Sequence, residues 1–165
     1  GSTFFFMDEG VDSGDILSQE RVVISKDETA GTLYEKVVKT ALRQIDGWIP
    51  ALTAGVHSPR PQPAGGGNLW RKRTERDGEI DWRMTEEGIY NLVRALSHPY
   101  PGARFRVDEN TIILWQAEPV KAPENLEPGK VLSVGKEGPI IKAGRGAVRL
   151  LKTEPPVTLR QGQYL

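Results

Sequence analysis

The sequence predicts an α+β protein in two parts, with strands and a long helix first and a run of short strands after a proline-containing hinge. Three observations support this fold class. Residues 27–52 repeat apolar side chains at spacings of three and four, as an amphipathic helix does. Five short β-type segments follow residue 102. The segment HPYPG at residues 98–102 lies before the run of β-type segments. We therefore expect a domain boundary after Pro101, with domains at 1–101 and 102–165.

Two short strands are expected at the start of the chain, on either side of an acidic loop. Residues 3–7 (TFFFM) are apolar and aromatic, and residues 15–24 (DILSQERVVI) alternate before a β-branched finish. The connecting stretch MDEGVDSGDIL holds two glycines and four carboxylates, which belong to Asp8, Glu9, Asp12 and Asp15. Glycine permits the turns that such a connection needs.

A long helix is expected from Asp27 to about Leu52, because acidic residues open it as the helix dipole favours. Pro50 lies where its periodicity weakens. Its apolar stripe would consist of Leu33, Val37, Ala41, Ile45 and either Trp48 or Ile49. Residues 55–68 (GVHSPRPQPAGGGN) contain three prolines and three consecutive glycines, which predicts an irregular linker loop.

The second half begins with a basic cluster that lies between Trp70 and Trp82 and consists of Arg71, Lys72, Arg73 and Arg76. Such a cluster suits phosphate contact, although a solvated face is its commoner role. We expect Trp82 to serve packing. A second helix at 85–97 is predicted from the cap at Thr85 and from the apolar stripe that follows. Strands are then expected at 103–107, 111–120, 130–134, 139–142 and 147–152, a spacing that suggests a small barrel or sandwich.

Composition excludes several classes of protein. Twenty-two basic and twenty-two acidic residues cancel, so no global field favours a polyanion or a membrane surface. Cysteine is absent, which removes disulfides, a thiol nucleophile and cysteine-ligated metal. No apolar run approaches the roughly 18 residues of a membrane span, and the N-terminus has no basic leader, so we expect a cytoplasmic protein without a membrane partner.

The acidic loop admits three interpretations on composition alone. A calcium loop of the EF-hand type starting at Asp8 would need oxygen ligands and a glycine at positions that this sequence fills differently. A hydrolase with paired carboxylates at Asp8 and Asp12 lacks a fixed separation between them. A plain acidic connection between strands is the third. His57 and His98 have no metal-ligand spacing and are expected to be loop histidines, so no metal site is predicted.

Two stretches together carry a family resemblance. STFFFMDEGVDSGDILSQE, followed by the long helix and then by DGEIDWRMTEEGIYNLVRALSHPYPGARF, resembles the folate-dependent formyltransferases, which include methionyl-tRNA and amino-sugar formyltransferases. The resemblance implies the C-terminal part of a Rossmann-like formyltransferase domain, followed by a small OB-like β-barrel. It also implies N10-formyltetrahydrofolate as the formyl donor.

The resemblance assigns roles to the acidic loop. Asp12, in VDSG, matches the catalytic aspartate of the family, and the five residues before it match the loop that wraps the pterin ring: Met7, Asp8, Glu9, Gly10 and Val11. An amine that attacks a formyl carbon must lose a proton, and its oxyanion needs a donor. An aspartate would fix the tautomer of an imidazole that takes this proton and would raise its proton affinity.

The sequence departs from the family in one respect that bears on activity. The family's Asn-x-His motif does not occur in this chain, nor does the glycine-rich first turn of a Rossmann unit. We therefore expect this chain to be a C-terminal portion that does not catalyse by itself.

The acceptor amine is predicted to belong to a nucleotide-linked amino sugar. Arg71 and Arg73 could meet its diphosphate bidentately, and Trp70 could pack on its base. Initiator methionyl-tRNA is the alternative, but ten basic against seven acidic residues after Pro101 is a modest excess for gripping tRNA. A hypothesis of another class is a non-catalytic OB-like module for single-stranded nucleic acid, although exposed aromatics are few there. A homodimer is compatible with the sequence.

Overall fold

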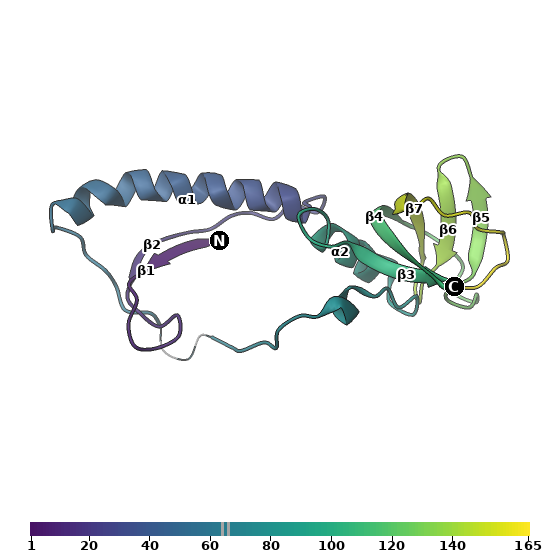
Figure 1. Ribbon diagram of the computed structural model, residues 1–165, viewed down its shortest axis with the longest axis horizontal. Coiled ribbons are helices and arrows are strands. Elements are labelled where there is room, and N and C mark those ends of the chain that lie inside the picture. Colours follow the sequence, from purple (N-terminus) through teal and green to yellow (C-terminus); the bar gives the residue numbers. More distant parts are fainter. Residues whose placement is uncertain (64, 66) are drawn as a thin grey trace. The chain divides into compact units, whose positions relative to one another are not determined.

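The computed structural model describes residues 1–63, 65 and 67–165. The described chain divides into two compact units (Figure 1). The first unit comprises residues 1–28 and 32–71, and the second comprises residues 29–31 and 72–165.

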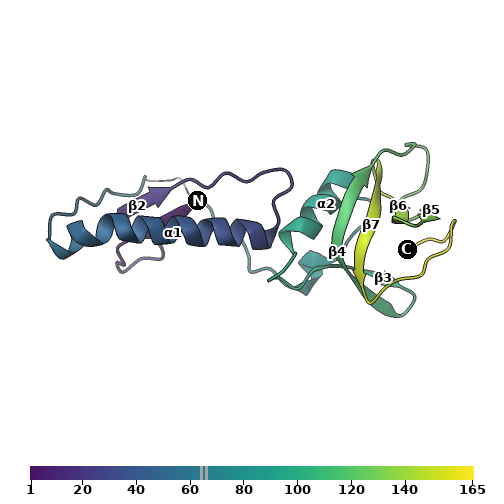
Figure 2. The same ribbon diagram turned by 90° about the horizontal axis from the view of Figure 1, so that it is seen from above.

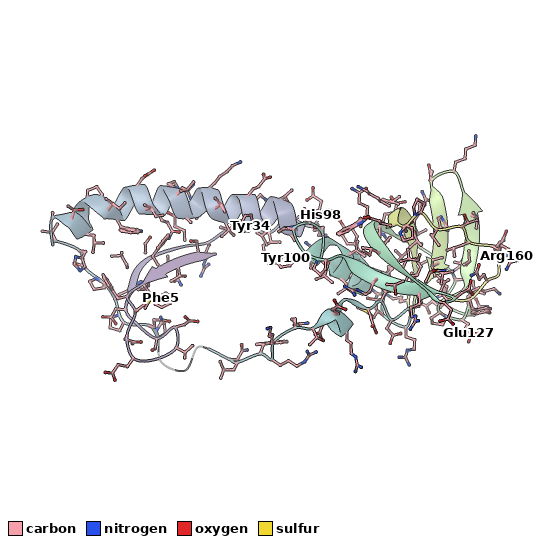
Figure 3. The ribbon with its side chains drawn as sticks, viewed as in Figure 1. Phe5, Tyr34, His98, Tyr100, Glu127 and Arg160 are labelled. Atoms are coloured by element: carbon pink, nitrogen blue, oxygen red, sulfur yellow. The ribbon has the colours of Figure 1, made fainter. Side chains whose placement is uncertain are left out.

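A two-stranded hairpin frames the acidic loop in the first unit. Strand β1 (Ser2–Phe5) pairs antiparallel with strand β2 (Ile16–Glu20), and the register shifts between Phe4 and Phe5. Phe5 ends β1 immediately before the loop (Figure 3). The aromatic run therefore forms a strand as predicted, and the acidic stretch is its connection to β2.

Helix α1 (Ala30–Thr53) confirms the long helix, and it includes Pro50. The predicted stripe is half-buried from Leu33 to Trp48, whereas Ile49 is exposed. The buried side chains of the helix are instead polar, those of Thr40 and Gln44. The Gln44 amide donates to Ser18 Oγ at 2.9 Å, which is a tertiary hydrogen bond that apolar periodicity could not predict.

A buried carboxylate precedes α1. Glu28 is 5% exposed, and its carboxylate accepts hydrogen bonds from Lys36 Nζ and from Ser25 Oγ. The hydrogen bond from Lys36, with further ones from Thr32 and Ser25, lowers the pKa of Glu28 to about 2. The sequence predicted only that an acidic residue here would favour the helix dipole. In the structure Glu28 also accepts hydrogen bonds that join α1 to the segment before it.

The second unit contains two helices and a five-stranded sheet. The short 3₁₀ helix η1 (Glu75–Gly78) is followed by α2 (Glu86–Ala95), whose N-cap Thr85 accepts from the backbone N–H of Gly88. The strands are β3 (Ala103–Val107), β4 (Asn110–Val120), β5 (Val131–Gly135), β6 (Gly138–Lys142) and β7 (Ala147–Glu154). These bounds confirm the second helix and the five strands to within two residues at each end.

The sheet is antiparallel, with the order β3-β4-β7-β6-β5. Short segments pair with both outer strands. Ile80 N–H donates to Arg104 O on β3, and Gly162 N–H donates to Val131 O on β5. Within the described residues no pairing joins β3 to β5, so the fold is a mixed α and β arrangement with an open sheet.

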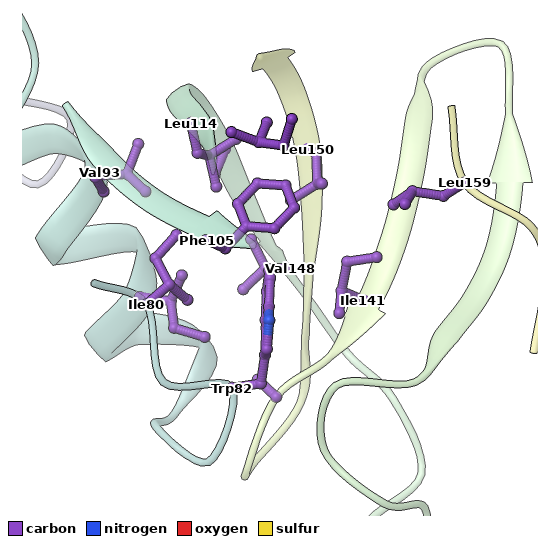
Figure 4. Packing of buried hydrophobic residues seen from close by; sticks show 14 of the residues in the cluster. Ile80, Trp82, Val93, Phe105, Leu114, Ile141, Val148, Leu150 and Leu159 are labelled. Carbon is purple, nitrogen blue, oxygen red and sulfur yellow. The ribbon is translucent and has the colours of Figure 1, made fainter. Parts of the chain in front are cut away.

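The core of the second unit lies between α2 and the sheet. Helix α2 packs against β4 and β7, and Figure 2 shows it beside β4. Ile89 and Val93 supply the buried face of α2. Trp82 is buried and meets Phe105 edge-on at 5.5 Å between ring centroids (Figure 4), which confirms its packing role.

This packing differs from the division predicted after Pro101. Residues 72–101 group with the strands, because Ile80, Trp82 and the apolar face of α2 are buried in the same cluster as Phe105 and Val148. The prolines of HPYPG do end helix α2. They do not separate two cores.

Candidate functional site

The acidic loop is held at both ends by backbone hydrogen bonds. Phe6 N–H donates to Asp15 O at 2.9 Å, which closes the hairpin behind the loop. Ile16 and Arg60 exchange two backbone hydrogen bonds, at 2.8 and 2.9 Å, so the segment after α1 runs beside β2. The loop from Met7 to Gly14 therefore projects from a fixed base.

Gly14 is needed at that base for steric reasons. It is buried, and a Cβ at this position would overlap the carbonyl oxygen of Phe6. Any larger residue would force the two arms of the loop apart. This is the structural reason for a glycine between Asp12 and β2.

Asp8 organises the loop internally. Its Oδ1 accepts from Gly10 N–H at 3.0 Å and from Ser13 Oγ at 2.8 Å. An aspartate that caps nearby donors in this way stabilises a turn. Asp8 thus has a structural role that its position in the acidic stretch did not reveal.

Asp12 is placed differently. Its φ is 55°, a left-handed conformation that aspartate adopts more readily than most residues. The residue is exposed, and within the described residues its carboxylate accepts no hydrogen bond, so it is available to a partner group. Of the two aspartates considered for paired chemistry, the structure engages Asp8 and leaves Asp12 open.

The remaining loop residues predicted to bind the pterin are all exposed. Met7 is 93% and Val11 is 90% exposed, which is unusual for apolar side chains of their size. Glu9 and Gly10 are exposed as well. Two apolar side chains beside a glycine turn could cover a flat ring, so the residue types suit the expected ligand.

Gln62 is the residue of this site that sequence reasoning missed. Its Nε2 donates to Asp12 O and to Gly14 O, both at 2.8 Å. Gln62 lies in the proline-rich stretch that was interpreted as a linker, and its partners are about 50 residues away in the sequence. No local pattern signals such a contact.

His57 also lies close to the loop. Its ring is 5.5 Å from that of Phe6 between centroids, and its Nδ1 is buried without a hydrogen-bond partner among the residues described. His57 is therefore packed on the aromatic side chain that precedes Met7. It is a loop histidine, as predicted.

The residues predicted to contact a diphosphate lie between residues 70 and 73. Trp70 is 75% exposed, and its indole N–H donates to Asn68 Oδ1 at 2.9 Å. Arg71 and Arg73 are exposed, and Arg73 lines a cavity of about 270 Å³ beside Leu92 and Leu96 in the second unit. Arg71 belongs to the first unit and Arg73 to the second. Their joint contact with a ligand stays a prediction.

A larger cavity, of about 850 Å³, lies in the second unit beside β3. Arg76, Arg83, Arg104 and Arg106 line it, together with Glu75, Glu79 and Asp81. Arg104 pairs with Glu75 at 3.2 Å, and Arg83 holds Asp81 through several hydrogen bonds that lower the pKa of the aspartate to about 2. The lining of this cavity therefore carries charges of both signs.

Two kinds of site have no support in the described part of the chain. No group of three or more histidine, cysteine, aspartate or glutamate side chains is arranged to hold a metal ion there. Nor is any helix there both long and apolar enough to traverse a bilayer.

Comparison with known proteins gives two family matches in the order expected. The family model for the formyl transferase C-terminal domain matches residues 72–160, and the formyl transferase model matches residues 1–45. Methionyl-tRNA formyltransferase of Burkholderia mallei is 32% identical over 157 residues, which are 94% of this chain and 48% of that protein. The chain thus spans about half the length of the curated relatives it matches.

Solved structures show the same fold. HypX from Aquifex aeolicus in complex with tetrahydrofolic acid is 22% identical with a TM-score of 0.68, over 90% of this chain and 26% of that one. An N-formyltransferase from Helicobacter canadensis, in complex with folinic acid and dTDP-3-aminofucose, is 15% identical with a TM-score of 0.67, over 90% and 54%. At these identities the likeness concerns the fold.

Proposed function

The chain belongs to the formyl transferase family, and from this premise we propose that it takes part in transfer of a formyl group from N10-formyltetrahydrofolate to a primary amine. The observation that carries the proposal is the placement of Asp12. It has an open carboxylate in a loop held at both ends, and its VDSG stretch resembles the catalytic segment of the family.

Asp12 would act through its charge. In the transfer, a bond forms between the amine nitrogen and the formyl carbon, the bond from that carbon to N10 of the folate breaks, and the proton that the amine loses ends on N10, which leaves as tetrahydrofolate. A carboxylate beside the imidazole that takes this proton stabilises the imidazolium and fixes the ring's tautomer. Since the chain has no Asn-x-His motif, we propose that the imidazole comes from outside these 165 residues and that the chain alone is inactive.

The residues Met7, Asp8, Glu9, Gly10 and Val11 would hold the pterin ring. Met7 and Val11 offer apolar contact, and Gly10 lets backbone groups approach the ring. Asp8 would contribute indirectly, since its carboxylate is engaged with Gly10 and Ser13. N10-formyltetrahydrofolate would supply the formyl group.

For the acceptor we propose a nucleotide-linked amino sugar. The stretch WRKRTERDGE before Trp82 resembles the amino-sugar branch of the family. Arg71 and Arg73 would meet the diphosphate, with Trp70 against the base. Methionyl-tRNA is the second candidate, and one observation favours it: the curated relatives at 32% and 33% identity are methionyl-tRNA formyltransferases. Against it stands the modest basic excess after Pro101.

We also propose that the sheet β3-β4-β7-β6-β5 forms an OB-like barrel. Its seam would lie between β3 and β5, beside which residues 79–80 and 162–165 pair with the outer strands or the residues next to them. If this unit were instead a non-catalytic module for single-stranded nucleic acid, its binding to an oligonucleotide would weaken steeply with salt.

The test is release of tetrahydrofolate by the protein expressed from its full reading frame. The formyl donor is supplied with a dTDP- or UDP-linked amino sugar, with initiator methionyl-tRNA, or without an acceptor. Release only with the sugar supports the proposal, and release only with the tRNA supports the second candidate. No release with either acceptor, together with salt-dependent oligonucleotide binding, would favour the non-catalytic module.

A further inference from the structure

We propose that Gln62 is a positioning residue that holds Asp12 in its working orientation by clamping the backbone on both sides of Ser13. This inference rests on the proposed function, since it concerns the carboxylate on which that function depends. Gln62 touches neither the reacting amine nor the formyl group in the proposed mechanism.

The geometry of the clamp is specific. The amide nitrogen of Gln62 has two hydrogens, and its contacts with Asp12 O and Gly14 O, at 2.8 Å each, use both. The two carbonyls belong to the peptide units that follow Asp12 and Gly14. Their contacts with Gln62 therefore restrain the backbone on both sides of Ser13, next to Asp12, whose φ is 55°. A side chain without two donors cannot make this pair of contacts.

The clamp is itself anchored. Arg60, two residues earlier, exchanges two backbone hydrogen bonds with Ile16, at 2.8 and 2.9 Å, and these do not depend on any side chain. Gln62 is half-buried, whereas Asp12, whose carbonyl oxygen it contacts, is exposed. The loop is thereby tied to β2 through a segment that follows α1.

Asp8 and Gln62 divide the work within the loop. Asp8 links Gly10 and Ser13 across the loop through side-chain contacts, whereas Gln62 holds the backbone carbonyls of Asp12 and Gly14. Because the Asp12 carboxylate has no hydrogen bond of its own in the described residues, its direction depends on its backbone. Loss of the clamp should therefore disturb Asp12 more than the pterin-facing half of the loop.

The experiment uses Gln62→Met, which keeps the length of the side chain and removes both donors. In the protein expressed from its full reading frame, we expect kcat for formyl transfer to fall about 10- to 100-fold, with KM for the formyl donor changed less than about threefold. Gln19→Met is the matched control, since it removes the hydrogen bonds with Thr3 and Arg60 and leaves the loop carbonyls alone.

A double-mutant cycle separates positioning from a general loss of structure. If Gln62 acts through Asp12, Gln62→Met should cause no further loss of kcat in an Asp12→Asn background. Additive losses, or an unchanged kcat in Gln62→Met, would overturn the proposal.

A second readout does not depend on activity. A protease that cuts before aspartate, with the products identified by mass, reports opening of the loop at the Val11–Asp12 bond in this 165-residue chain, next to the carbonyl that Gln62 holds. We expect cleavage about tenfold faster in Gln62→Met and unchanged in Gln19→Met. Equal rates in Gln62→Met and wild type would refute the clamp. Absence of formyl transfer in the wild type would refute the proposed function alone, and cleavage would still decide whether the clamp exists.

Discussion

Asp12→Asn should lower turnover without destabilising the protein, whereas Asp8→Ala should destabilise the loop with less effect on turnover. The two aspartates are only four residues apart. Asp12 is exposed, and its carboxylate accepts no hydrogen bond in the described part of the chain. Asparagine also tolerates the left-handed conformation at φ 55°. Asp12→Asn should therefore change the free energy of unfolding by less than about 0.5 kcal/mol.

The effect of Asp12→Asn on catalysis should be large. Replacing the carboxylate beside an imidazole removes the charge that stabilises the imidazolium and leaves the tautomer unset. Such a change lowers turnover by about 10²–10⁴-fold, or about 3–5 kcal/mol in the activation barrier. The assay is tetrahydrofolate release at saturating donor and acceptor, in the protein expressed from its full reading frame.

Asp8→Ala removes an acceptor from two hydrogen bonds, with Gly10 N–H and Ser13 Oγ. Each is worth about 0.5–1.5 kcal/mol, less at an exposed site, so we expect a loss of about 1–2 kcal/mol in loop or unfolding stability. This loss should appear as a higher KM for the donor with a smaller change in kcat. If the two variants lost kcat equally, or if Asp12→Asn kept kcat within about threefold of wild type, the division of roles would be wrong.

Three further predictions concern the frame that holds the site. Leu150→Ala should lower the free energy of unfolding by about 3 kcal/mol in urea titrations, whereas Leu151→Ala should lower it by less than about 1 kcal/mol, because these neighbours on β7 are 2% and 46% exposed; equal losses would mean that the faces of the sheet are misassigned. The pKa of Glu28 is lowered to about 2 by its hydrogen bond with Lys36, so stability present above pH 4.5 should decline as pH falls toward 2, and this decline should be smaller in Glu28→Gln. Gly14→Ala should destabilise the loop by about 2 kcal/mol or more, seen as faster proteolysis, since its Cβ would overlap a backbone oxygen; unchanged proteolysis would refute the tight closure of the hairpin.

The elements of this protein could be predicted because their signals are local. The short β-type segments after Gly102 became β3 to β7, and the capped apolar stripe from Thr85 became α2. Each depends on side chains within one strand or a few helical turns, which the sequence displays directly. The family resemblance came from motifs of the same short range.

The assignment of those elements to cores could not be predicted in this way. The prolines of HPYPG, which follow helix α2, predicted a domain boundary after it and so placed α2 with the N-terminal half. Burial of Ile89, Val93 and Trp82 beside Phe105 places it with the strands instead. A proline ends a helix through its own backbone, but it does not determine which surface the helix packs against.

By itself, the sequence determined that an acidic, glycine-containing connection joins two strands and that Asp12 lies in a stretch like the catalytic segment of a formyltransferase. Only the tertiary structure decided which carboxylate is engaged and which is open, through the contacts of Asp8 with Gly10 and Ser13. It also brought Gln62 to the carbonyls of Asp12 and Gly14 across about 50 residues. Hydrogen bonds of this kind depend on where the chain returns in space, and no periodicity in the sequence records that return.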